Sequence, residues 1–100
     1  KKPLVLARKP GKLPGETIEA SYDLEYGKNT LCIQKSSIEP FESFSIIDDL
    51  LATGGTAACV EKMLLSSNKK VKSLSVVVEL PFLNGRKSLD CEVNSVVKLD

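Results

Sequence analysis

Short apolar runs, separated by glycine, proline and polar residues, dominate this sequence. Such runs are typical of strands in an α/β protein, whose sheet is covered on both faces. We predict four strands of this kind, at residues 4–7, 44–47, 71–80 and 93–99. The first is expected to be buried and to lead into a loop rich in proline and glycine.

Two other elements can be read from the pattern. Residues 17–24 and 30–34 are β-rich and partly alternating, with Gly27-Lys28-Asn29 between them, which predicts a hairpin able to move as a flap. A polar connector is predicted over residues 36–42, which include a proline. Apolar residues at helical spacing predict a helix from Ala57 to about Ser67, with Thr56 as its N-cap.

The order strand, loop, helix, strand predicts the fold class. It is typical of α/β proteins with a mostly parallel sheet, whose ligands bind at the carboxyl ends of the strands. A turn is predicted at Asn84-Gly85-Arg86, before the last strand. The glycine-rich segment that follows residues 44–47 therefore stands where a ligand is expected.

Composition and charge argue against some classes of function. The 100 residues fit one small domain, which is short for an enzyme that must enclose two substrates. Fourteen basic and thirteen acidic residues leave a net charge of +1, so we expect no nucleic-acid partner. No apolar run approaches the roughly 20 residues needed to span a bilayer, so we expect a cytoplasmic protein without a membrane partner.

The cysteines do not indicate a metal site or a catalytic nucleophile. Cys32, Cys59 and Cys91 are far apart and odd in number, and the chain has no histidine to complete a metal site. We interpret them as buried thiols. Any proton transfer is left to carboxylates, lysines or tyrosines.

The residues from Asp48 to Thr56 carry the strongest chemical signal. Glycines and threonines before a helix offer backbone and hydroxyl donors to a phosphate group, and glycine allows close approach. Asp48 and Asp49 are acceptors placed for the vicinal hydroxyls of an attached ribose. Successive strand residues face opposite ways, so both acids can meet one sugar only if the backbone turns there.

The string from Ile46 to Thr56 resembles the phosphoribosyl-diphosphate (PRPP) signature of type I phosphoribosyltransferases. The resemblance implies an incomplete α/β domain of that kind, with a mostly parallel sheet and a hairpin flap. It assigns Asp48 and Asp49 to the ribose, with Asp48 also catalytic, and Mg²⁺ held mainly through PRPP and diphosphate rather than by a direct protein ligand. It assigns the 5-phosphate of PRPP or AMP to Ala52, Thr53, Gly54, Gly55 and Thr56.

Four further segments are similar to the adenine-specific branch of that family. The basic loop that carries Arg8, Lys9 and Lys12 would bind diphosphate. Glu25 and Tyr26 resemble catalytic residues of a mobile flap. Residues 77–80 and 83–86 also match the branch, so the resemblance covers nearly the whole chain.

The implied reaction transfers the 5-phosphoribosyl group from PRPP to adenine and yields AMP and diphosphate in a homodimer. Members of the branch carry an N-terminal hood and first core strands that do not match any part of residues 1–100. We therefore expect the C-terminal part of a single domain, inactive alone, with its base specificity open. The alternatives are a non-catalytic PRPP or nucleotide sensor and a plain α/β domain.

Overall fold

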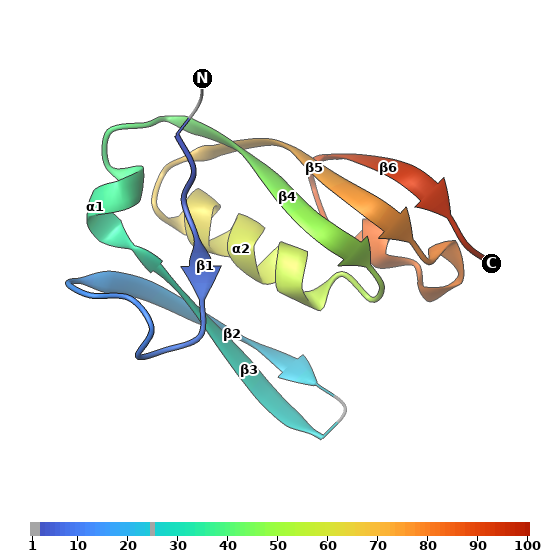
Figure 1. Cartoon of the computed structure of the whole chain (residues 1–100), viewed down its shortest axis with the longest axis horizontal. Helices are drawn as coiled ribbons and strands as arrows, with labels where there is room; N and C mark the ends of the chain where they lie inside the picture. The colour runs from blue at the N-terminus through green and yellow to red at the C-terminus, as the bar shows by residue number, and fades with distance from the viewer. Residues whose placement is uncertain (1–2, 25) are drawn as a thin grey trace.

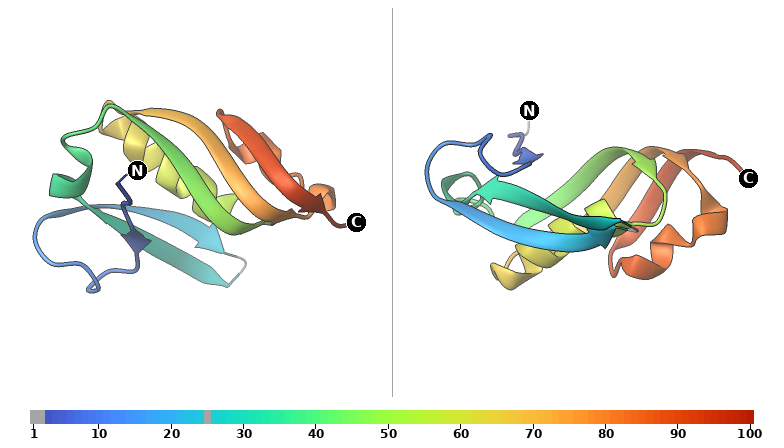
Figure 2. Two further views of the ribbon diagram at one scale, coloured as in Figure 1. Left: turned by 45° about the horizontal axis from the view of Figure 1, so that its top comes forward. Right: turned by 90° about the horizontal axis from the view of Figure 1, so that it is seen from below.

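Two three-stranded sheets enclose one helix in this protein (Figures 1 and 2). The computed structural model describes residues 3–24 and 26–100. The antiparallel sheet has the order β1-β3-β2, from Ala7–Arg8, Gly27–Gln34 and Thr17–Leu24. The parallel sheet has the order β4-β5-β6, from Ser43–Leu51, Lys70–Glu79 and Glu92–Lys98.

Four shorter or helical elements connect the strands. Helix α1 spans Lys35–Ile38, and α2 spans Gly55–Ser66 between β4 and β5. Two 3₁₀ helices, η1 (Pro81–Leu83) and η2 (Gly85–Ser88), link β5 to β6. The described helices are all too short to cross a membrane.

Helix α2 is buried on two sides, and this produces two apolar clusters. Toward the antiparallel sheet, Cys59, Met63 and Leu64 pack with Ile33 and Ile38. Toward the parallel sheet, Ala57 packs with the cluster formed by Leu51, Leu74, Val76 and Leu89. A single helix therefore holds the hairpin onto the sheet, and its N-terminus is fixed by contacts on both sides.

The predicted fold class is confirmed: a parallel sheet with an antiparallel hairpin sheet beside it. Details of the predicted elements differ. The predicted turn residues Gly27, Lys28 and Asn29 all belong to β3, because the strand pairs with β2 up to Leu24↔Gly27. The connector predicted from Ser36 overlaps α1, whose Ile38 is buried in the hairpin cluster.

The first apolar run does not form the buried strand that was predicted. Only Ala7 and Arg8 pair, with β3, and Leu4 and Leu6 are 79% and 51% exposed. Val5 and Ala7 face the cluster instead. The run alternates because it lies along the side of the hairpin sheet, where only one face is covered.

The parallel sheet has one covered and one open face. Leu74 and Val76 point toward α2, so the alternate residues of the sheet point the other way. On that open face Ile47, Val77 and Val96 are 78%, 53% and 79% exposed. The predicted burial of these strands thus holds for one face only.

The thiols behave largely as predicted. Cys32 and Cys59 are free and buried, and Cys91 is free and half-buried. Burial raises the pKa of both Cys32 and Cys59. These two side chains therefore act as apolar core residues.

Candidate functional site

The glycine loop, residues Ala52–Thr56, joins the end of β4 to α2 (Figure 1). Leu51 before it is buried, and its carbonyl accepts a hydrogen bond of 2.9 Å from the backbone N–H of Leu80. Ala57 after it is buried in the same cluster. The loop therefore lies at the carboxyl end of the parallel sheet, as predicted, and both of its ends are anchored.

Packing explains the two glycines of the loop before any ligand is considered. Gly54 has a φ of +91°, and a Cβ placed on it would lie 2.6 Å from the backbone oxygen of Gly85. A Cβ on Gly55 would lie 3.0 Å from the Tyr22 ring. Each glycine thus admits a neighbouring segment against the loop.

The N-cap of α2 differs from the prediction. Gly54 rather than Thr56 holds this position, without a side-chain cap, and Thr56 lies inside the first turn. The backbone at the entry to α2 is left-handed, a conformation that glycine adopts without strain and that threonine adopts only rarely. The hydroxyl of Thr56 is consequently not used for capping.

The loop presents donors to solvent at the start of α2. Thr53 and Thr56 are exposed, Ala52 and Gly55 are half-buried, and Gly54 is buried. The first N–H groups of a helix have no partner within the helix, and its dipole favours negative charge. These donors suit a phosphate group.

Asp48 and Asp49 lie within β4, which continues to Leu51, so the turn expected at the acids is absent. Asp48 is half-buried and its carboxylate accepts the Asp49 N–H at 2.8 Å, whereas Asp49 is exposed. Burial, with a smaller contribution from Asp49, raises the pKa of Asp48. The two carboxylates start from opposite faces of the strand, and their joint contact with one ribose stays a prediction.

The segment from Pro81 to Ser88 contacts the glycine loop. Ser88 Oγ donates to the Thr53 carbonyl at 3.2 Å. A Cβ on Gly85 would lie 2.5 Å from the Ala52 carbonyl oxygen, so the two backbones are in direct contact. The conformation of the loop therefore depends on this segment.

An ion pair between the buried Glu79 and the partly exposed Arg86 fixes that segment to the sheet. Arg86 Nε and Nη2 donate to the two carboxylate oxygens of Glu79 at 2.7 and 2.8 Å. Arg86 also donates to the Val93 carbonyl at 3.1 Å, and Ser95 donates to Glu79 at 2.9 Å. Arg86, followed by Ser95, lowers the pKa of Glu79 to about 2 despite the burial of the carboxylate.

The hairpin touches the loop through Tyr22, a residue to which the sequence assigned no role. Its hydroxyl lies 2.8 Å from Thr56 Oγ1, and Asn29 Nδ2 donates to the same hydroxyl at 3.2 Å. A second link joins the Cys59 thiol to the Ala20 carbonyl at 3.4 Å. The β-rich pattern and the resemblance of residues 20–27 to a mobile flap drew attention to this strand, but neither gave Tyr22 a role.

Of the two predicted flap residues, Glu25 lies outside the described residues. Tyr26 is 93% exposed at the end of the hairpin. Their catalytic assignment stays a prediction.

The predicted diphosphate residues are exposed and apart from the glycine loop. Arg8 ends β1, and Lys9 and Lys12 lie in the following loop. This loop lies at the opposite end of the hairpin sheet from the hairpin tip, away from the turn between β4 and α2 in all views (Figures 1 and 2). The assignment of these three residues to diphosphate stays a prediction.

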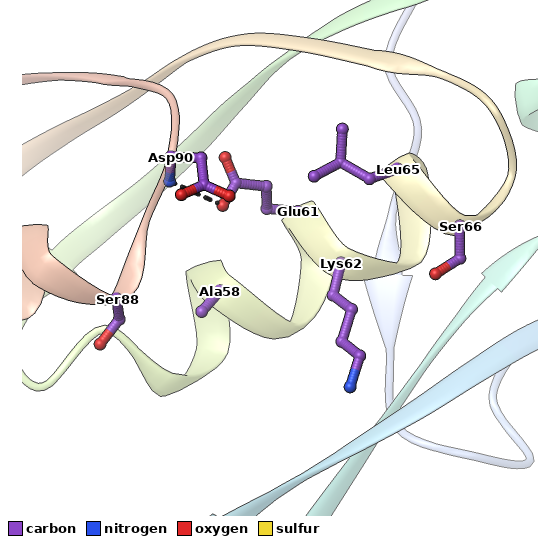
Figure 3. A pocket seen from close by; sticks show the side chains of 7 residues that line it. All are labelled: Ala58, Glu61, Lys62, Leu65, Ser66, Ser88 and Asp90. Atoms are coloured by element: carbon purple, nitrogen blue, oxygen red, sulfur yellow. Dashed lines mark hydrogen bonds between the residues drawn. The ribbon is translucent and has the colours of Figure 1, made fainter.

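A shallow depression of about 460 Å³ lies on the outer side of α2, lined by Ala58, Glu61, Lys62, Leu65, Ser66, Ser88 and Asp90 (Figure 3). Glu61 is used structurally, since its carboxylate accepts the backbone N–H groups of Asp90 at 3.1 Å and Cys91 at 3.0 Å. Burial, then Glu61, raises the pKa of Cys91 to about 11, which leaves it an unreactive thiol. The depression thus offers no chemistry comparable to the glycine loop.

Protein ligands for a metal are sparse in this chain. Within residues 3–24 and 26–100 there is no group of three or more Cys, Asp or Glu side chains that could hold an ion. The adjacent carboxylates of Asp48 and Asp49 still suit Mg²⁺, which is commonly bound by one or two carboxylates together with substrate phosphates. The donor set therefore fits an ion that arrives with its substrate.

Comparison with known proteins gives consistent results. No protein-family model matches the chain. A curated adenine phosphoribosyltransferase from Prochlorococcus marinus is 59% identical over 96 residues, which are 96% of this chain and 56% of that protein. The chain thus spans about half the length of the curated relatives it matches.

Solved structures agree with the sequence comparison. The adenine phosphoribosyltransferase from Thermoanaerobacter pseudethanolicus has a TM-score of 0.88 and 45% identity, covering 95% of this chain and 56% of that one. The Saccharomyces cerevisiae enzyme, complexed with an imino-altritol bisphosphate and adenine, has a TM-score of 0.87 and 39% identity over 92% and 52% of the two chains. The chain is homologous to part of these enzymes and shares their fold, which favours the catalytic interpretation over the sensor.

Proposed function

We propose that this chain carries the phosphoribosyl-binding part of an adenine phosphoribosyltransferase, an enzyme of purine salvage. The observation that supports this most is the place of the string Asp48–Thr56, which runs from the end of a parallel strand into the N-terminus of α2. Its homologues are adenine phosphoribosyltransferases. The whole protein would convert adenine and PRPP to AMP and diphosphate.

The 5-phosphate is assigned to the glycine loop. Its oxygens would accept hydrogen bonds from the exposed hydroxyls of Thr53 and Thr56 and from the first backbone N–H groups of α2. The loop is already held in shape by Ser88 and by the contact between Gly54 and Gly85. Such preorganisation reduces the entropy lost when the ligand binds.

The ribose is assigned to the two carboxylates. A hydroxyl donates and a carboxylate accepts, so Asp48 and Asp49 can bind the vicinal pair on the sugar. In the transition state, positive charge develops at the ribosyl C1 as the C1–oxygen bond to diphosphate breaks and the bond to the base nitrogen forms. Asp48, bound to the ribose, would stabilise this charge electrostatically.

The leaving group is assigned to the basic loop. Diphosphate takes both electrons of the broken bond, and Arg8, Lys9 and Lys12 would bind the charge that it gains. Magnesium, bound with the substrate and Asp48 or Asp49, would neutralise part of the same charge. Tyr26 would act from the flap with Glu25, excluding water from the reacting centre. We place the enzyme in the cytoplasm and expect a homodimer.

Calorimetry of ligand binding to this chain tests the proposal. AMP and ribose 5-phosphate are expected to bind with one site per chain, and Thr53→Val should weaken both by about tenfold, the effect of one hydrogen bond to a charged group. Ser73→Ala removes a hydroxyl near the amino end of β5 and should leave both affinities unchanged. If neither ligand binds, or if Thr53→Val has no effect, the assignment of the loop is wrong.

A further inference from the structure

We propose that Tyr22 is a positioning residue of the glycine loop, whose hydroxyl directs the Thr56 proton toward a bound phosphate. The inference rests on the proposed function, because it explains how one donor of that site is oriented. Tyr22 belongs to β2 of the hairpin and Thr56 to the first turn of α2. The two residues are 34 positions apart, so their contact exists only in the folded protein.

Two contacts hold the Tyr22 side chain against the loop. Its ring lies beside Gly55, where even a methyl group would approach it to 3.0 Å. Its hydroxyl lies 2.8 Å from Thr56 Oγ1. Because the ring and the hydroxyl are both fixed, the phenol has little freedom to find another partner.

A third residue favours one direction of the hydrogen bonds. The Asn29 Nδ2 group can only donate, and it donates to the Tyr22 oxygen at 3.2 Å. The Tyr22 oxygen accepts this bond, which leaves the Tyr22 proton available to Thr56 Oγ1, and this is the direction that we infer for the 2.8 Å contact. Each bond in such a chain polarises the next one.

The consequence falls on Thr56. Its oxygen accepts from Tyr22, so its own proton is left for another acceptor, and Thr56 is exposed at the start of α2 where a phosphate oxygen is expected. In the opposite arrangement Thr56 would donate to Tyr22 and present only lone pairs to an anion. The chain Asn29, Tyr22, Thr56 therefore converts a hydroxyl of ambiguous orientation into a donor.

The same contact joins the hairpin to the phosphate. Tyr22 lies three residues before Glu25 on the strand that leads to the hairpin tip. A phosphate that binds Thr56 would be joined to the hairpin through the Tyr22–Thr56 bond, because each hydrogen bond in the chain polarises the next. Binding of the 5-phosphate and placement of the hairpin are thereby linked.

Calorimetry of Tyr22→Phe tests the inference, because this change keeps the ring beside Gly55 and removes only the hydroxyl. We expect the affinity for ribose 5-phosphate to fall about fivefold to tenfold, as for a weakened hydrogen bond to a charged group, and that for adenosine, which has no phosphate, to be unchanged. Asn29→Ala should give a smaller fall in the same direction. Ser21→Ala, which removes the 2.7 Å bond between Ser21 and Thr30 in the same hairpin, is the matched control.

A spectroscopic readout separates positioning from general stability. The chain has two tyrosines and no tryptophan, so ¹³Cζ-tyrosine NMR gives two signals that Tyr22→Phe assigns. We expect the Tyr22 signal to shift on titration with ribose 5-phosphate and not with adenosine.

The outcomes separate the two claims. Wild-type affinity for ribose 5-phosphate in Tyr22→Phe, or a Tyr22 signal that the phosphate does not move, would overturn the inference and leave the proposed function standing. If the wild-type chain itself binds no ribose 5-phosphate, both are overturned.

Discussion

At the residue scale, Gly54 shows how one position combines a backbone requirement with a packing requirement. Its φ is +91°, and a methyl group there would meet the Gly85 carbonyl at 2.6 Å. We expect Gly54→Ala to lower the free energy of unfolding by roughly 2–4 kcal/mol, the sum of left-handed strain and overpacking. Urea unfolding measures this loss.

Gly11 provides the control for that measurement. It has a similar φ of +84°, but a Cβ there would meet nothing within 4 Å. Gly11→Ala should therefore cost only about 1 kcal/mol, the strain alone. Equal losses for the two variants would show that the contact with Gly85 is unimportant.

Asp48 is a residue at which we expect function and stability to oppose each other. Its pKa is raised, chiefly by burial, so its charged form is less stable in the folded than in the unfolded chain. This destabilisation is absent at acid pH and appears as the pH rises from the unfolded pKa through the higher folded pKa. Asp48→Asn should accordingly raise Tm at pH 7, lose that advantage at acid pH, and weaken AMP more than inorganic phosphate.

Thermal unfolding across pH, combined with calorimetry, measures both effects in one variant. Asp49→Asn is the matched comparison, because Asp49 is exposed and should change Tm little. A lower Tm for Asp48→Asn at pH 7 would contradict the expectation, as would an equal loss of AMP and phosphate affinity.

Residue identities were easier to predict than residue contacts. The order of Asp48, Gly54 and Thr56 pointed to the proposed phosphoribosyl site, because these residues are close together in the sequence. The role of Tyr22 and the closeness of Gly54 to Gly85 were not predictable, since each contact joins segments about 30 residues apart. The predicted N-cap at Thr56 is wrong because Gly54, which is left-handed and lies against Gly85, holds the N-cap position without a side-chain cap.

At the element scale, the link between β5 and β6 behaves as one supporting unit for the glycine loop. Glu79 is buried, and Arg86 joins its carboxylate to the 3₁₀ helix that carries Gly85. The folded-state pKa of Glu79 is about 2, against an ordinary value of 4.5. Its stabilising effect is therefore complete above about pH 4.5 and is lost as the pH falls toward 2.

Disruption of this pair should be costly because it leaves a buried carboxylate without its partner. We expect Arg86→Leu to lower the free energy of unfolding at pH 7 by about 2–4 kcal/mol, less than for a fully buried pair since Arg86 is partly exposed. The exposed Lys87 of the same 3₁₀ helix supplies the control, Lys87→Leu, which should cost little.

Acid unfolding gives a second test of the pair. Glu79→Gln should lose less stability than wild type between pH 4.5 and 2, because its side chain does not titrate. Parallel acid-unfolding curves for the two proteins would show that Glu79 does not contribute there.

The elements themselves were largely predictable, and their surroundings were not. Helix α2 and the strands β4 to β6 follow from helical spacing and dense apolar runs, which local sequence determines. Whether each strand is covered depends on what packs against it. The run at residues 4–7 was expected to be buried, yet it pairs beside the hairpin and leaves Leu4 and Leu6 exposed.

At the scale of the whole molecule, the parallel sheet is incompletely covered. Ile47, Val77 and Val96 form an apolar stripe on the face opposite α2, and parallel sheets are normally covered on both faces. β4 is also an edge strand within the described sheet. A sheet of this kind favours self-association of the isolated chain.

The last prediction follows from this incompleteness: the 100-residue chain should bind ribose 5-phosphate yet form AMP poorly. Residues can be assigned to the phosphate, the ribose and part of the diphosphate, but none to the purine. The chain spans about 56% of the relatives that it matches. Without contacts to orient the base nitrogen against C1, we expect a kcat/KM at least about a hundredfold below that of a full-length relative, a loss that poor positioning alone can cause.

Radiochemical assay of AMP formation from adenine and PRPP with Mg²⁺ measures this difference. The full-length Prochlorococcus marinus relative, 59% identical over the shared part, is the reference enzyme. Calorimetric binding of ribose 5-phosphate by the same sample of the chain establishes that a low rate does not reflect unfolding. Turnover within about tenfold of the reference, or roughly 1.4 kcal/mol of barrier, would mean that the contacts which orient the purine lie within these 100 residues after all.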